Sequence, residues 1–204
     1  MTNDEFLTAK KETLLHGAKY CLANANAHFE CAQESGKIRH YGIANSLLIL
    51  SVEECIKCAA LLSGYLNVKI PFAIEPIFYK HRDKHKQAAE VQPLMEEIFL
   101  IKSIVQTILE KRKLTFSFIL DLALLVIFLK NYEKKKEKIA LWWKEANNLK
   151  NKGFYVDFKN NNWVSPDCFN EENYIESLGI AKTFVEVLEF VKDLRDEDYK
   201  SLSR

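Results

Sequence analysis

The stretch that decides the fold is YGIANSLLILSVEECIKCAALLSGYL, residues 41–66. It is apolar on nearly every side and carries three charges, Glu53, Glu54 and Lys57. A helix that is hydrophobic all round is normally buried among other helices. The sequence therefore predicts a central helix in an all-α protein. The three charges need an explanation, because burying an unpaired charge costs several kcal/mol.

Two interpretations of these charges remain open. In the first, Glu53 and Lys57 stand four residues apart and form an ordinary surface ion pair. In the second, Glu54 and Lys57 belong to a polar site inside the helical core, whose other members come from a different helix. On a helical wheel this second pair interrupts an apolar stripe formed by Ile43, Leu47, Leu50 and Leu61.

Helical periodicity continues on the N-terminal side of this stretch. Apolar side chains recur at helical spacing from Asp4 to Glu34, with Asn3 in the N-cap position. The Ser35-Gly36 pair supplies a stop signal. Because only a tight turn follows before Tyr41, the sequence predicts that the two long helices form an antiparallel hairpin.

Helical patterns also fill the C-terminal half of the chain. One continues to about residue 113, with Pro93 either kinking it or dividing it in two. The next covers 116–150 and ends at Lys152-Gly153. The last runs from about 171 to 199. Its predicted buried face is formed by Ile175, Leu178, Ala181, Val185 and Leu188.

The segment GFYVDFKNNNWVSP, residues 153–166, differs in character. Aromatic and β-branched residues alternate on both sides of the Asn160-Asn161-Asn162 run, which predicts a small β-hairpin or an ordered aromatic loop. This segment is too short to be a domain. The predicted fold is a bundle of five or six helices around one core, forming a single domain over residues 1–204.

Composition limits the classes of function. The chain has 204 residues, of which 48% are hydrophobic and 28% charged, and its formal net charge is +1. These values are typical of a globular protein and provide no global field for nucleic acid or an anionic membrane. Five cysteines show no disulfide framework, and the polar N-terminus is unlike a signal peptide. We therefore expect a cytoplasmic protein.

A membrane partner is not expected either. The longest apolar run, FSFILDLALLVIFL at 116–129, contains Asp121 and is shorter than the roughly 20 residues that a bilayer span requires. It is interpreted as a core helix. The basic segment at 130–138 leaves a helix lying on the membrane surface as the alternative.

The strongest chemical constellation is FYKHRDKHK, residues 78–86, in which four basic residues accompany one acid, Asp83. On a helix, His81, Lys84 and His85 share one face. The simplest interpretation is a solvated basic helix start. Two histidines at this spacing also suit a metal, but the sequence offers no third ligand in a recognised zinc pattern, so no metal or other cofactor is expected.

Four blocks of sequence, in this order, resemble a known family. They are SVEECIKCAALL at 51–62, HRDK at 81–84, KGFYVDF at 152–158 and NNWVSP at 161–166. Together with the long N-terminal helical hairpin, they resemble the AbiV abortive-infection proteins of the HEPN superfamily over about Lys11 to Leu188. The resemblance implies a HEPN-like helical bundle and an anti-phage protein that halts host translation when a phage-encoded activator triggers it.

The resemblance also implies a catalytic hypothesis. Many HEPN relatives are metal-independent endoribonucleases that act as homodimers, although Arg82 and His85 are more closely spaced here than the Arg and His of those enzymes. Such cleavage needs a base, an acid and cations near the phosphate. His81 and His85 are the predicted acid and base, and Glu54 orients Lys57 or a histidine. The predicted cations are Arg82, Lys84 and Lys57.

The competing class is a non-catalytic helical protein that blocks translation by contact with RNA or with a ribosome-associated protein. Under this hypothesis, residues 78–86 form a basic docking surface. Residues 153–166 then form an aromatic recognition loop, although aromatic residues in an ordered loop more often serve ordinary packing.

Overall fold

The computed structural model describes residues 3–65, 77–78, 85, 88–92, 95 and 140–202. Within these ranges the chain is mostly helical with one small β-hairpin, which confirms the predicted fold class. The helix predicted over 116–150 is described only from residue 140, where residues 140–154 are helical. The predicted residues His81, Arg82 and Lys84 lie outside the described ranges.

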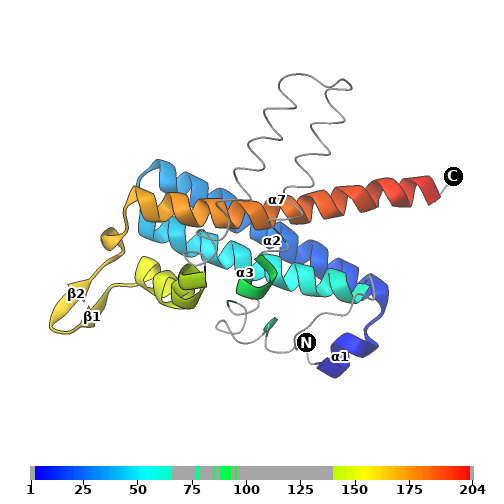
Figure 1. Cartoon of the computed structure of the whole chain (residues 1–204), viewed down its shortest axis with the longest axis horizontal. Coiled ribbons are helices and arrows are strands. Elements are labelled where there is room, and N and C mark those ends of the chain that lie inside the picture. Colours follow the sequence, from blue (N-terminus) through cyan, green and yellow to red (C-terminus); the bar gives the residue numbers. More distant parts are fainter. Residues whose placement is uncertain are drawn as a thin grey trace, which may run out of the picture.

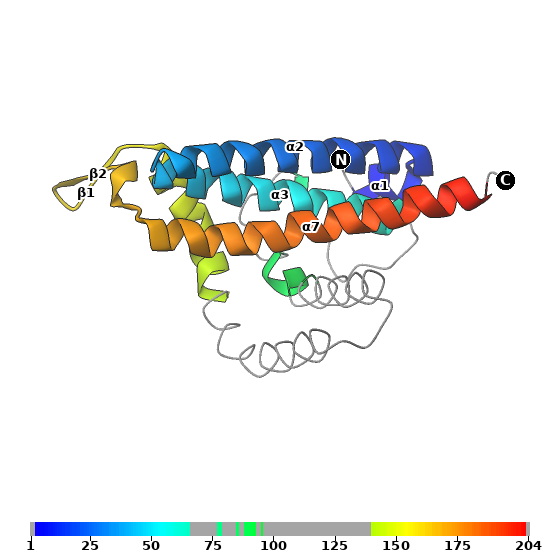
Figure 2. The ribbon, with the colours of Figure 1, turned by 90° about the horizontal axis from the view of Figure 1, so that it is seen from above.

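Three long helices form the body of the bundle. α2 spans Lys11–Lys37, α3 spans Tyr41–Tyr65 and α7 spans Glu171–Leu202, while the short α1 covers Asn3–Thr8. Figure 1 shows α2, α3 and α7 running along the same axis, and in Figure 2 α3 lies between the other two. The predicted antiparallel hairpin of the first two long helices is confirmed.

α3 is central because most of its circumference is apolar. Leu48, Ile49, Val52 and Ile56 are each at most 1% exposed. Ser51 Oγ donates a hydrogen bond of 2.8 Å to the carbonyl oxygen of residue 25 on α2, so even a polar residue on this helix serves the packing. α3 therefore behaves as the buried core helix that its composition predicts.

The orientation of α3 differs from the helical-wheel prediction. The stripe containing Glu54 and Lys57 is the partly open side of the helix, and Ile43 on that stripe is 38% exposed. The fully buried charge is instead Glu53, which is 2% exposed. A helix that is apolar all round gives no preferred inward direction, so the wheel alone could not assign the faces.

The two predicted helix ends are confirmed to within one residue, since α2 ends at Lys37 and the helix from residue 140 ends at residue 154. Gly36 and Gly153 each lie one residue before the end of their helix, at points where another group approaches too closely for a side chain. A Cβ on Gly36 would lie 2.4 Å from Cζ of Tyr174, and one on Gly153 would lie 2.2 Å from the carbonyl oxygen of Gly42. After α2 the chain reverses at Arg39, which takes the left-handed conformation with φ of 63°.

The segment after residue 154 forms the predicted hairpin. β1, Asp157–Lys159, pairs antiparallel with β2, Asn162–Val164, and Phe158 is directly opposite Trp163. Asn160 and Asn161 form the two-residue turn with φ of 50° and 59°. Positive φ at both positions is the requirement of a type I′ turn, which asparagine tolerates. The 3-10 helix η1, Pro166–Cys168, then leads into α7.

The buried face of α7 is only partly the predicted one. Ala181, Val185 and Leu188 are buried, but Ile175 is 57% exposed. In this first turn Tyr174 packs inward instead, stacked on Tyr41 of α3 with ring centroids 5.8 Å apart. In the described ranges, no helix is long and apolar enough to cross a membrane.

Candidate functional site

A buried cluster of charged and polar side chains crosses the bundle around Glu53. Its Oε1 atom accepts a hydrogen bond of 2.7 Å from Lys150 Nζ and lies 2.9 Å from His85 Nε2. The three residues are 2%, 6% and 3% exposed, and they come from α3, the 140–154 helix and position 85. Because a carboxylate only accepts, Nε2 is the protonated nitrogen that donates to it.

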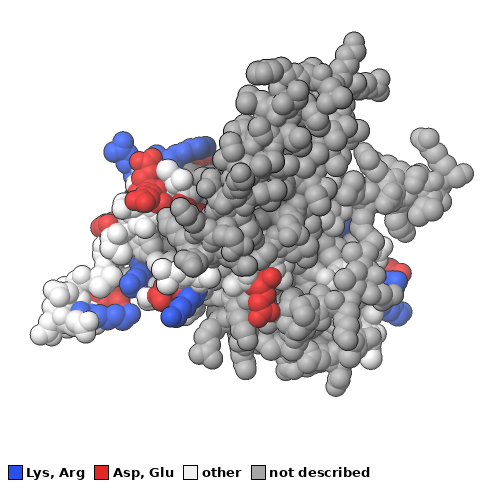
Figure 3. All heavy atoms as spheres, in the orientation of Figure 1, with Lys and Arg blue, Asp and Glu red and all other residues white. Residues whose placement is uncertain are grey.

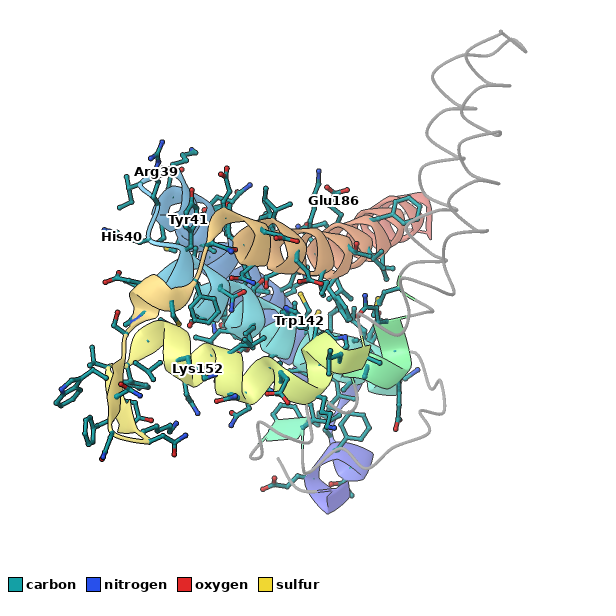
Figure 4. The ribbon with its side chains drawn as sticks, turned by 60° about the vertical axis from the view of Figure 1, so that its left-hand side comes forward. Arg39, His40, Tyr41, Trp142, Lys152 and Glu186 are labelled. Carbon is teal, nitrogen blue, oxygen red and sulfur yellow. The ribbon has the colours of Figure 1, made fainter. Side chains whose placement is uncertain are left out.

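Lys150 joins the 140–154 helix to α3 at two points. Its ammonium reaches Glu53, and its carbonyl oxygen lies 2.8 Å from Ser46 Oγ, two helical turns earlier on α3. The glycine at 153 allows this close approach, because a side chain there would collide with Ser46 and the α3 backbone. Figure 4 shows the 140–154 helix, with Trp142 and Lys152 labelled, lying across α3.

Two tryptophans extend the polar cluster on either side of the 140–154 helix. Trp143 packs against the His85 ring with centroids 6.1 Å apart, and its Nε1 donates to Oε1 of the buried Gln92. Trp142 Nε1 donates a 2.9 Å hydrogen bond to Ser177 Oγ on α7. Each indole N–H therefore finds a partner in the core, as buried tryptophan requires.

A second polar chain continues from Trp142 into α3. Ser177 Oγ, which accepts from Trp142, donates in turn to Asn45 Oδ1. Asn45 is 1% exposed, and its Nδ2 is buried without a hydrogen-bond partner. Turning the amide over would give Nδ2 the serine as a partner but would leave the oxygen unpaired, so one polar atom stays unsatisfied in either orientation.

The predicted pair of Glu54 and Lys57 forms a half-buried ion pair on the open side of α3. Glu54 Oε1 lies 2.5 Å from Lys57 Nζ, and the two side chains are 15% and 18% exposed. The alternative prediction, a surface pair of Glu53 with Lys57, is wrong because Glu53 points into the core. Whether Glu54 and Lys57 act on a substrate stays a prediction.

His85 is the one other predicted site residue within the described ranges. The structure brings it to α3, as expected for two converging segments, but its partner there is Glu53. At 3% exposure, and with Trp143 against its ring, the imidazole is shielded from solvent. A group that must touch RNA needs access, so in this structure His85 acts as an anchor.

The buried cysteines do not add chemistry to the cluster. Burial raises the pKa of the Cys58 thiol to about 12 and raises the pKa of Cys55 well above its usual value. Both are therefore protonated thiols at neutral pH and weak nucleophiles. In the part of the chain that the structure describes, no three His, Cys, Asp or Glu side chains are placed to hold a metal ion.

Sequence reasoning missed Lys150, Gln92 and the partnership of Trp142 with Ser177. Residues 150 and 53 are 97 positions apart, and a single sequence carries no signal for so distant a contact. Glu53 had one usable signal, since Val52 and Ile56 flank it with apolar side chains on both adjacent faces of the helix.

A family model for AbiV, a HEPN-type family, matches residues 13–186 of the chain. The match covers the bundle, the cluster around Glu53 and the hairpin. No match was found among curated proteins or among solved structures.

Proposed function

The chain belongs to the AbiV family of HEPN-type abortive-infection proteins, and from that premise we propose that it is a phage-triggered effector that shuts down host translation. A phage-encoded protein is the proposed activator, and a cytoplasmic homodimer is the proposed working form. RNA cleavage without a metal is the proposed chemistry. His81 takes the proton of the 2′-hydroxyl as the 2′-oxygen attacks the phosphorus, and the protonated imidazole then gives a proton to the leaving 5′-oxygen, which leaves a 2′,3′-cyclic phosphate. Arg82 and Lys84 then hold the phosphate charge.

The contact between Glu53 and His85 is the observation that carries this proposal. It joins α3 to one end of the basic segment at 78–86 through a buried hydrogen bond of 2.9 Å. A buried, charge-assisted hydrogen bond of this kind fixes the position of the segment that carries it. We assign His85 the role of a positioning residue, and the proposed proton transfer rests with His81.

Lys150 strengthens the same anchor. Its ammonium supplies the positive charge that a buried carboxylate needs, so Glu53 stays available as an acceptor for His85. Loss of Glu53 would remove the acceptor that Lys150 and His85 share. The three together therefore support a fixed position for His85.

The test is a comparison of infected cells that carry the wild-type chain or a variant. Incorporation of a labelled amino acid after infection should stop with wild type and continue with His81→Ala. Lys144→Ala, a change at an exposed lysine on the 140–154 helix, serves as the matched control and should behave as wild type. Continued protein synthesis with the wild-type chain would refute the proposed shutdown.

The burial of His85 favours a second candidate function, in which the chain stops translation by contact alone. The imidazole is 3% exposed, so it reaches no substrate in this structure. The basic segment would then dock on RNA phosphates or on an acidic protein surface. An experiment with purified components distinguishes cleavage from binding alone. The protein is incubated with its activator and with transfer and ribosomal RNA, and only cleavage leaves 2′,3′-cyclic phosphate ends.

A further inference from the structure

The β-hairpin projects from one end of the bundle (Figure 1), and several of its apolar side chains are exposed. Val156, Phe158 and Trp163 are 61%, 53% and 74% exposed. A two-stranded hairpin alone in water is marginally stable, and three or more strands or a covering helix are normally needed. The hairpin therefore exposes apolar side chains that a partner strand or surface would cover.

The two faces of the hairpin differ in chemistry. Phe158 and Trp163 are cross-strand partners with ring centroids 5.0 Å apart, so both lie on one face. Because side chains alternate along a strand, Asp157 and Lys159 lie on the opposite face. Figure 3 shows the hairpin end as mainly uncharged, with few blue or red atoms. An aromatic face without cations fits protein better than single-stranded nucleic acid, which needs a positively charged groove.

Among the described residues, no strand other than β2 pairs with β1, which leaves its other edge open for pairing. Lys159 and Asn162 flank the two-residue turn and form a hydrogen-bonded pair. The next pair, Phe158 with Trp163, is therefore of the non-hydrogen-bonded type. The N–H and C=O groups of Phe158 thus point away from β2, toward the outer edge of β1. The Phe158 N–H donates instead to the Asp157 carboxylate at 2.9 Å. The other oxygen of that carboxylate lies 2.6 Å from Lys159 Nζ.

We propose that β1 pairs antiparallel with β1 of a second copy of this chain, about a two-fold axis at Phe158. This register sets Asp157 opposite the partner's Lys159, and Lys159 opposite the partner's Asp157. Both charge pairs are attractive, so the edge is complementary to itself. The exposed carboxylate gives up its local partners and gains equivalent ones across the axis.

The pairing would complete the sheet. Four strands result, and the aromatic pairs of the two copies form one continuous row on the same face. β2 offers no comparable register, because its residues Asn162, Trp163 and Val164 carry no charge. This pairing would form the homodimer of the proposed function. The role of the dimer rests on that function, whereas the pairing itself does not.

Charge exchange at the two strand positions tests the inference. Asp157→Lys places lysine opposite the partner's lysine, and Lys159→Asp places aspartate opposite aspartate, so each variant should self-associate at least about tenfold more weakly than wild type. Both side chains are about half exposed, at 48% and 56%, so neither change disturbs the core. Lys144→Asp, outside the hairpin, is the control.

Sedimentation velocity over a concentration series gives the result. Wild type and the control should dimerise, the two variants alone should be mainly monomeric, and an equimolar mixture of the variants should recover the dimer. The inference is overturned if the wild type is monomeric, which is the result expected if the hairpin docks on a foreign protein. It is also overturned if the mixture of the two variants stays monomeric. Recovery of the dimer without RNA cleavage would refute the proposed chemistry alone.

Discussion

Replacing Lys150 with methionine is the sharpest test of the buried cluster. The change keeps the length of the side chain but removes the ammonium that lies 2.7 Å from Glu53 Oε1. Glu53 is 2% exposed, so water cannot take the place of the lost partner. The carboxylate then retains His85, at 2.9 Å, as its remaining partner among the described contacts.

The expected loss follows from the cost of a broken buried ion pair. Removing one partner of a buried ion pair lowers the free energy of unfolding by about 3–5 kcal/mol. Because Glu53 keeps its hydrogen bond from His85, we expect a loss at the lower end, about 3 kcal/mol. For a chain of this size, 1 kcal/mol shifts the melting temperature by roughly 2–4 °C. Lys150→Met should therefore melt roughly 6–12 °C below wild type.

Thermal and urea unfolding, followed by far-UV circular dichroism, provide the assay. Lys144→Met, at an exposed position of the same helix, should stay within about 0.5 kcal/mol of wild type. Adding Glu53→Gln to Lys150→Met should restore part of the loss, because a neutral amide still accepts from His85 and leaves no unpaired charge. A Lys150→Met protein as stable as the control, or losses that simply add, would refute the reasoning.

Further predictions concern the glycines and the thiols. Gly153→Ala should cost about 1–3 kcal/mol, because its Cβ would lie 2.2 Å from a carbonyl oxygen of α3. Gly179→Ala should gain roughly 0.5–1 kcal/mol, because nothing lies within 4 Å of the added Cβ; denaturant titration of both variants measures this contrast. At pH 8, mass spectrometry after iodoacetamide treatment should show Cys31 and Cys168, which are exposed, modified first. Cys58, with a pKa of about 12, should react only after unfolding, and its modification in the native protein would contradict the assignment.

Local features of the fold could be predicted from the sequence. The all-round apolar character of residues 41–66 placed α3 in the core, and the tight connection before Tyr41 predicted its antiparallel pairing with α2. The aromatic and asparagine pattern at 153–166 predicted the hairpin, since Asn160 and Asn161 suit a turn that requires positive φ. In each case the deciding interaction lies within a few residues along the chain.

Features decided by distant contacts could not be predicted in this way. Gly36 and Gly153 lie at helix ends, as predicted, but only the approach of Tyr174 and of the α3 backbone shows that packing also requires glycine there. One of the two interpretations placed Glu53 in a surface pair, and neither joined it to Lys150, which is 97 positions away. A charged residue can be identified as buried only when its partner is known, and a single sequence does not show which residues pair.

The proposal of RNA cleavage is tested most directly by mapping RNA ends in infected cells. Total RNA is taken through the infection from cells that carry wild type or His81→Ala, and new 2′,3′-cyclic phosphate ends are counted alongside protein synthesis. The account predicts that these ends appear with wild type as translation stops and are missing with His81→Ala. Translation that stops with no new ends, or equal ends in both strains, would contradict it.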